Sequence, residues 1–308
     1  MKRFTIATLV AALALLLVQG AALACTSFAV YGSEPIYGMN FDYALFPMKI
    51  RIVTAKDGLH TFHLSFEKKL GEQRFFGDTG GMNSNGLFYA CQEQHPFELN
   101  PPEPQEGNMP LYLLNKTPEH AGTVKEIEKA CANTHLIQFK GVTIHTLFAD
   151  KTGRAMVVET GKKQNIFTHM TGNYIAMANF PNHTLTGKSY TEAQGFGDLR
   201  YKIICRHLEK ARKDFHFDSG LTLLKKAQDQ DPMLSSGCSM VFVPTTNNIY
   251  IAFHADFSRI WKVSLMEGTI ETFRGFKTKI KRSLGQDGLL VSDLVSQSLF
   301  SDLISQSL

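Results

Sequence analysis

The sequence lacks the features that mark several common classes of protein. Beyond its first 24 residues it has no long apolar run, so no stable membrane insertion is predicted. The formal net charge is only +4, and a near-neutral chain does not indicate nucleic-acid binding. Its five cysteines form no C-x-x-C pair and its histidines no H-E-x-x-H motif, so the sequence predicts no metal site and no cofactor.

The first 24 residues have the three-part build of a signal peptide. They begin with Lys2 and Arg3, continue with the apolar run Leu9–Val18, and end with the small residues Ala22 and Ala24. We therefore expect cleavage after Ala24 and a secreted or periplasmic mature protein of 284 residues.

Cleavage there makes Cys25 the first mature residue, and three interpretations of it are open. As a lipid anchor it would be acylated through its sulfur, although Ala22 stands where such signals place leucine. As an ordinary cysteine it would be a buried thiol or half of a disulfide. As an N-terminal nucleophile it would carry a thiol and a free α-amine on one residue. The sequence fixes no pairing among the other cysteines, which are Cys91, Cys131, Cys205 and Cys238.

The nucleophile interpretation is chemically self-sufficient. An α-amine has a pKa near ~8, so part of it is neutral and can accept the proton of the Cys25 thiol. The thiolate then attacks an amide carbonyl, an acyl-cysteine forms, and water hydrolyses it. Removal of the leader therefore creates the base, and neither a metal nor a separate histidine is required.

The hydrophobic periodicity predicts blocks of strands with helices between the blocks. Alternating apolar residues indicate strands near the mature start, such as Thr26–Tyr31, and again toward the end, such as Ser239–Val243. Between them, Thr123 and Glu126 fit a capping box, and Leu199–Arg212 has the apolar spacing of a helix. This order favours an α+β fold with antiparallel sheets covered by helices.

A single domain is predicted over residues 25–280, followed by a C-terminal tail over residues 281–308. The tail contains a short duplication, SDLVSQSLF at Ser292–Phe300 and SDLISQSL at Ser301–Leu308. We expect a loosely ordered tail, with a short amphipathic docking helix as the alternative.

Three further patterns carry less information. Asn115 and Asn182 begin Asn-x-Thr sequons, which are glycosylated only in a eukaryotic secretory pathway. Cys238 lies in an S-G-C-S sequence that opens a strand pattern, so a buried thiol is expected rather than a nucleophile turn. His60 and His63 are three apart in a predicted strand and therefore point to opposite faces.

Several motifs occur in order along the chain: C-T-S-F at 25–28, G-M-N-F-D-Y at 38–43, G-M-N-S-N-G-L at 81–87, M-A-N-F-P at 177–181 and R-Y at 200–201. Together they resemble the choloylglycine hydrolase family, which contains conjugated bile acid hydrolases and penicillin V acylases. The resemblance implies the four-layer αββα sandwich of N-terminal-nucleophile hydrolases and the hydrolysis of a non-peptide linear amide.

The resemblance also implies roles for individual residues. Cys25 is the expected nucleophile, and Asp42 holds its amine and thiol in place. Asn179 donates its side-chain amide to the oxyanion, and Arg200 polarises the site and supports Asp42. The second oxyanion donor is a backbone N–H that falls near Glu93, where the family usually has asparagine or tyrosine.

One departure from the family changes the expected chemistry. Met39 stands where the family has arginine, and the loss of that cation should leave Cys25 less acidic. It also makes the predicted substrate pocket more apolar, with Met39, Phe41, Tyr43 and Phe46. The acyl and amine halves of the substrate stay open.

The expected partner is a small-molecule amide. The interval between the fourth and fifth motifs is short beside the bile-salt enzymes, where a long excursion helps to build tetramers, so we expect a monomer or small homo-oligomer. Two alternatives remain: an acyltransferase of the isopenicillin N acyltransferase type, and a lipid-anchored binding protein with Cys25 as its anchor.

Overall fold

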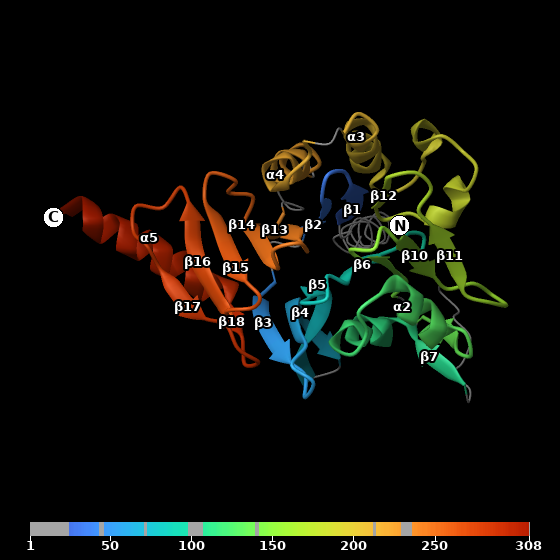
Figure 1. Cartoon of the computed structure of the whole chain (residues 1–308), viewed down its shortest axis with the longest axis horizontal. Coiled ribbons are helices and arrows are strands. Elements are labelled where there is room, and N and C mark those ends of the chain that lie inside the picture. The colour runs from blue at the N-terminus through green and yellow to red at the C-terminus, as the bar shows by residue number, and fades with distance from the viewer. Residues whose placement is uncertain are drawn as a thin grey trace, which may run out of the picture.

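The computed structural model describes residues 25–42, 46–70, 73–97, 107–138, 142–211, 214–228 and 236–307. The predicted signal peptide and Tyr43 lie outside these residues. Within them, two eight-stranded sheets stack on each other and helices cover their outer sides (Figure 1).

The first sheet combines the N-terminal strands with the C-terminal hairpins, and its neighbouring strands pair antiparallel. In spatial order its strands are β12 (Tyr174–Met177), β1 (Thr26–Tyr31), β2 (Pro35–Phe41), β13 (Cys238–Val243), β14 (Asn248–Phe253), β15 (Ile260–Ser264), β16 (Thr269–Arg274) and β17 (Lys281–Ser283). Because β1 lies between β12 and β2, the start of the domain is held beside the next strand and beside a strand from a distant part of the sequence.

The second sheet is also antiparallel throughout. In spatial order its strands are β11 (Ile166–His169), β10 (Ala155–Glu159), β9 (Ile144–Ala149), β6 (Phe88–Glu93), β5 (Gln73–Asn83), β4 (His60–Leu70), β3 (Met48–Thr54) and β18 (Leu289–Leu290). A small parallel pair outside this sheet joins β7 (Asn108–Pro110) and β8 (His135–Ile137).

Alternation along the strands divides the side chains between an inner and an outer face of each sheet. The inner faces meet in one apolar core, in which aromatic rings such as Phe88 and Phe242 pack with centroids 4.9 Å apart. This burial supplies the main hydrophobic stabilisation and fixes which side chains face the space between the sheets.

Helices cover the two outer faces. The first sheet is covered by α3 (Asp198–Leu208) and α4 (Phe217–Lys226), and the second by the 3-10 helix η1 (Leu111–Glu119) and by α2 (Val124–Cys131) (Figure 1). Two short 3-10 helices, η2 (Asn182–Leu185) and η3 (Tyr190–Glu192), precede α3. The result is a four-layer αββα sandwich, so the predicted fold class is confirmed.

The N-cap predicted for α2 is present, but the reciprocal bond from Glu126 goes to the residue before Thr123 rather than to Thr123 itself. The Thr123 hydroxyl accepts the Glu126 backbone N–H at 3.3 Å, and the Glu126 carboxylate accepts the Gly122 N–H at 2.8 Å. The helix buries Val124 and Ile127 against the second sheet. A local pattern therefore located this helix correctly, because both capping contacts lie within five residues.

The C-terminal segment differs from the expected loose tail. β17 pairs with β16, β18 pairs with β3, and the final helix α5 (Val291–Ser307) packs beside β3. The two copies of the duplication are nine residues apart, which at about 100° per residue turns the second copy to the opposite helix face. Leu294 is accordingly 2% exposed and its counterpart Leu303 is 64% exposed. The helical alternative was correct, but the helix is not amphipathic.

All five cysteines are buried, and none forms a disulfide. Cys238 lies inside β13, so the buried thiol expected there is confirmed. None of the helices in the described ranges is long and apolar enough to cross a membrane.

Candidate active site

Sheet pairing gathers the predicted site around Cys25. Its thiol lies in the core between the sheets, and the residue is 1% exposed. The register of β1 with β12 places Asn179, two residues beyond the end of β12, beside Cys25. The register of β1 with β2 brings Asp42, the residue after β2, to the same end of the sheet.

Arg200 links these residues from α3. Its Nη1 donates to the Cys25 carbonyl oxygen and to Thr26 Oγ1, both at 2.7 Å. Its Nη2 donates to Asn179 Oδ1 at 3.0 Å. Its Nη1 also lies 3.7 Å from Asp42 Oδ2. The four residues predicted as catalytic therefore form one contact group, and the planar guanidinium fixes their relative positions.

Arg200 reaches the site because a glycine precedes α3. Gly197 has a φ of 82°, in the left-handed region that favours glycine. A Cβ at this position would lie 2.5 Å from Arg200 Nη2. Any larger residue would therefore strain the backbone and displace the guanidinium, a requirement that the sequence pattern does not signal.

The side-chain amide of Asn179 has a defined orientation. Since Arg200 donates to its Oδ1, the Nδ2 group points the other way, and it donates to the Glu93 carbonyl oxygen at 2.8 Å. The Asn179 carbonyl oxygen accepts the His95 backbone N–H at 2.7 Å. An amide Nδ2 carries two N–H groups, and the Glu93 carbonyl takes one of them.

Glu93 lies at the end of β6, beside Asn179. Its neighbour Gln94 donates its backbone N–H to Thr143 across the β6–β9 edge at 2.8 Å. Because N–H groups alternate sides along a strand, the N–H of Glu93 faces the other edge. The expected oxyanion donor is thus close to Asn179, and its role there stays a prediction.

Asp42 is fully buried and has a partner that sequence reasoning missed. Ser236 donates its hydroxyl to Asp42 Oδ1. Ser236 is held there because Gly237, the next residue, donates its N–H to the Phe41 carbonyl oxygen at 2.9 Å. No sequence motif indicates this contact, which joins residues 194 positions apart.

The surroundings of the Cys25 thiol raise its pKa. Burial is the largest cause, and the negative charge of Asp42 adds to it, whereas Arg200 acts in the opposite direction. The effect expected from Met39 stays a prediction, because the causes of this shift are burial and the neighbouring charges. The thiol is therefore neutral at physiological pH and needs a base before it can attack a carbonyl.

The predicted pocket residues fall in different environments. Met39 and Phe41 are 0% and 1% exposed within the core, and Phe41 packs on Phe66 with ring centroids 5.2 Å apart. Phe46 is 40% exposed, and Tyr43 lies outside the described residues. Contact of these residues with a substrate stays a prediction.

A groove of about 700 Å³ lies elsewhere, between the edge strands β11 and β12 and the 3-10 helices η2 and η3. Its lining includes Thr168, Tyr174, Asn182 and Tyr190. Since Cys25 is not among its lining residues, this groove is separate from the predicted site.

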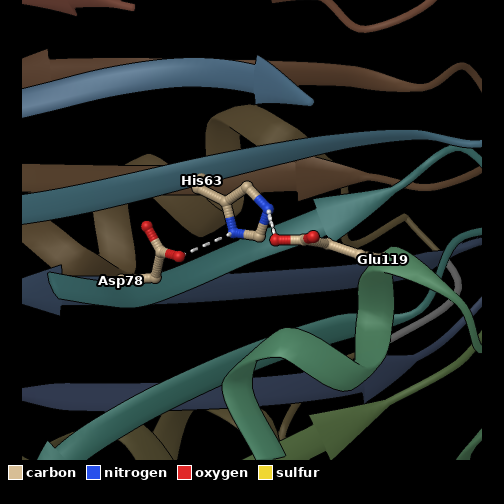
Figure 2. A group of neighbouring side chains, drawn as sticks. All are labelled: His63, Asp78 and Glu119. Atoms are coloured by element: carbon tan, nitrogen blue, oxygen red, sulfur yellow. Dashed lines mark ion pairs between the residues drawn. The ribbon is translucent and has the colours of Figure 1, made fainter. Parts of the chain in front are cut away.

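A histidine and two carboxylates meet on the outer face of the second sheet. Figure 2 shows the ring of His63 between Asp78 and Glu119, with Nδ1 3.8 Å and Nε2 3.3 Å from their oxygens. These types of side chain bind metals, but the Lys116 ammonium already lies 2.6 Å from Asp78 and 3.1 Å from Glu119. We therefore describe the group as a network of ion pairs and assign it no metal.

Both carboxyl groups of this network are strongly acidic. Burial by itself raises the pKa of Asp78, but His63, Lys116, Ser65 and Arg51 outweigh it and lower the pKa to about 2. The contact with His63 is the largest cause that lowers the pKa of Glu119 to about 2. Arg51 completes the network with two hydrogen bonds to Asp78, at 2.8 and 3.0 Å.

The two sequons are inaccessible in the folded chain. Asn115 is 1% exposed and Asn182 is 4% exposed. Their side-chain amides donate to backbone carbonyls, of Asp78 at 3.2 Å and of Ala176 at 3.0 Å respectively. A glycan on either asparagine is therefore incompatible with this structure.

Comparison with known proteins shows which solved structures have a similar fold. No protein-family model and no curated protein matches this sequence. Two variants of conjugated bile acid hydrolase from Clostridium perfringens match in structure with TM-scores of 0.58 and 0.59, at 16% and 14% identity, covering 82% of this chain and 98% of theirs. Penicillin V acylase from Agrobacterium tumefaciens matches with a TM-score of 0.56 at 12% identity, covering 81% and 91%. The chain therefore has the fold of these N-terminal-nucleophile hydrolases.

Proposed function

We propose that this chain is an exported amidase of the choloylglycine hydrolase and penicillin V acylase family. Removal of residues 1–24 exposes Cys25, which then hydrolyses a non-peptide linear amide through an acyl-thioester. The observation that carries the proposal is the position of Arg200, whose guanidinium contacts the Cys25 carbonyl oxygen and the Asn179 side chain and lies near Asp42. The shared fold supports it independently.

In the first step the free α-amine of Cys25 accepts the thiol proton, and the thiolate adds to the amide carbonyl. The resulting oxyanion accepts hydrogen bonds from the second N–H of Asn179 Nδ2 and from the Glu93 backbone N–H. Collapse breaks the C–N bond, and the α-ammonium returns its proton to the leaving amine. Water then attacks the thioester, giving its proton to the α-amine, and releases the acid and the thiol.

The surrounding residues prepare this reaction. Because burial raises the pKa of the thiol, an unprocessed chain, whose Cys25 nitrogen is an amide, holds the sulfur in its unreactive form. Asp42 stabilises the α-ammonium that forms during attack. Arg200 holds the Asn179 amide in the orientation that presents its donors before the substrate arrives.

The buried position of the Cys25 side chain disfavours the lipid-anchor alternative. Its side chain is 1% exposed and packs between the two sheets. An acylated sulfur would have to leave this core to reach a bilayer. No observation favours acyl transfer over hydrolysis, so the hydrolase is the function we propose.

The test begins with the mass of the protein recovered from a secreting host. We expect an unmodified chain that starts at Cys25 and cleaves members of a panel of N-acyl amides. Cys25→Ser should reduce the rate about 1,000-fold or more, since a hydroxyl is a far weaker nucleophile with this base. An added alanine before Cys25 should abolish activity and keep the circular dichroism spectrum. Full activity in either variant, or a lipid on Cys25, would overturn the proposal.

A further inference from the structure

A second buried carboxylate contacts the segment that follows Asn179 and has no part in the mechanism above. Glu159 is the last residue of β10, and its side chain is completely buried. An ionised side chain in such a place is costly unless it is paired and hydrogen-bonded, so its contacts indicate what it holds.

Glu159 holds the start of η2. Its Oε1 accepts the backbone N–H of Asn182 at 2.8 Å, and its Oε2 accepts the backbone N–H of His183 at 2.9 Å. The His183 ring nitrogen Nδ1 lies 3.0 Å from the same Oε2, and His145 Nδ1 lies 3.6 Å from Oε1. Burial by itself raises the pKa of Glu159, but the contacts with His145 and His183 outweigh it and lower the pKa, so the carboxylate is ionised at neutral pH.

Only two residues separate Asn182, whose N–H Glu159 binds, from Asn179, whose amide is the proposed oxyanion donor. Phe180 is 1% exposed and packs on Tyr201 with ring centroids 5.1 Å apart, and Pro181 has its φ fixed at −62°. Asn182 Nδ2 donates to the Ala176 carbonyl oxygen at 3.0 Å, and this hydrogen bond ties the end of the segment to β12. The chain from Asn179 to Asn182 thus has little freedom, and a shift at its far end displaces Asn179.

We propose that Glu159 is a positioning residue for the oxyanion amide: its carboxylate holds the N–H groups of Asn182 and His183 and so places Asn179 beside Cys25. This inference rests on the proposed amidase function. The carboxylate acts on the transition state through Asn179, because its hydrogen bonds are with the segment that follows Asn179 and not with Cys25.

The chain offers a matched control at the other end of the hairpin formed by β9 and β10. Asp150, which follows β9, is also completely buried, and it accepts the Val124 backbone N–H at the start of α2 at 2.7 Å. Both carboxylates accept a backbone N–H at the beginning of a helix, α2 for Asp150 and η2 for Glu159. Only Glu159 is connected to the site, so Asp150→Asn should destabilise the protein and leave the kcat unchanged.

Glu159→Gln tests the inference in the enzyme that begins at Cys25. A glutamine has one side-chain oxygen, so its NH₂ group faces one of the two backbone N–H donors. We expect kcat to fall about 10- to 100-fold with KM within about twofold, since a small misplacement of an oxyanion donor acts on the transition state. Asp150→Asn should change kcat less than about twofold. If Glu159→Gln does not fold, His183→Ala, whose ring is 41% exposed, removes one contact and should lower kcat about two- to threefold.

A double variant separates positioning from a general structural effect. In an Asn179→Ala background, Glu159→Gln should lower kcat little further, because the amide through which it acts is already absent. Equal losses from Glu159→Gln with and without Asn179 would overturn the inference, as would a normal kcat in the single variant. An inactive wild-type enzyme over the whole amide panel would overturn the amidase proposal itself, and the inference with it.

Discussion

Two buried polar groups in this molecule look alike in composition and differ in their contacts. One lies between the sheets around Cys25, and the other lies between the second sheet and η1 around His63. Each contains a nearly inaccessible carboxylate and an arginine, Asp42 with Arg200 and Asp78 with Arg51. The second group, with its histidine and two carboxylates, has the residue types more often associated with catalysis or metals.

The arginines of the two groups make different contacts. Arg51 directs two hydrogen bonds to Asp78, and Lys116 adds a third cation contact, so the charge of that carboxylate is fully compensated. Arg200 stays 3.7 Å from Asp42 and donates instead to neutral oxygens around the thiol. The network around His63 therefore stabilises the fold, whereas the group around Cys25 orients polar atoms near the neutral Cys25 thiol. Contacts, rather than residue types, distinguish the two roles.

Replacing each arginine by lysine should have the largest effect and should separate the two roles. Arg200→Lys replaces a planar fork with a single ammonium that cannot hold the Cys25 carbonyl, Thr26 and Asn179 together. We expect kcat/KM of the enzyme that begins at Cys25 to fall about 100-fold, because the oxyanion amide loses its orientation. The matched variant Arg51→Lys should stay within about twofold of wild type in kcat/KM. Similar losses in both variants would remove the distinction drawn here.

Neutralising Asp78, the buried carboxylate of the His63 network, should lower the stability of the protein and leave its activity unchanged. Asp78→Asn leaves Arg51 without its ion-pair partner, and the Asp78 side chain is only 3% exposed. We expect the free energy of unfolding in urea to fall by about 2–3 kcal/mol, less than for a fully buried pair because Lys116 is half-exposed and stays hydrated. The kcat should not change. A stable but inactive variant would show that the network belongs to the site.

Acid should weaken the network gradually, with the smallest effect of the three. The folded pKa values of Asp78 and Glu119 are lowered to about 2, from ordinary values of 3.8 and 4.5. Groups with depressed folded pKa values stabilise fully above their unfolded pKa, and this stabilisation is lost as the pH falls toward 2. We expect the Tm to decline between about pH 4.5 and 2 and to decline less in Asp78→Asn. If the Tm of the wild type and of Asp78→Asn declined equally over this pH range, the loss of stability would not come from Asp78.

The parts of the site that sequence reasoning identified are those tied to local motifs. Cys25, Asp42, Asn179 and Arg200 each lie in a short recognisable motif, and the structure brings all four together. Ser236 was missed because its only signal is a contact with Asp42 across 194 positions. Glu159 was missed for the same reason, since its carboxylate accepts N–H groups that lie 23 and 24 residues further along the chain.

The order of the amino acids was sufficient for the α+β class and for the helix capped by Thr123, because periodicity and capping are properties of neighbouring residues. Through a family resemblance it also singled out four residues that the fold brings together, and their catalytic roles stay predictions. It offered the helical C-terminus only as an alternative, and it did not predict the left-handed turn that lets Arg200 reach the site or the difference between the His63 network and the Cys25 group. Those features depend on which side chains meet when two sheets stack, and the energy of a buried charge is set by the partners it meets there. Residue types can be listed from a linear chain, but their pairing exists only once the chain is folded.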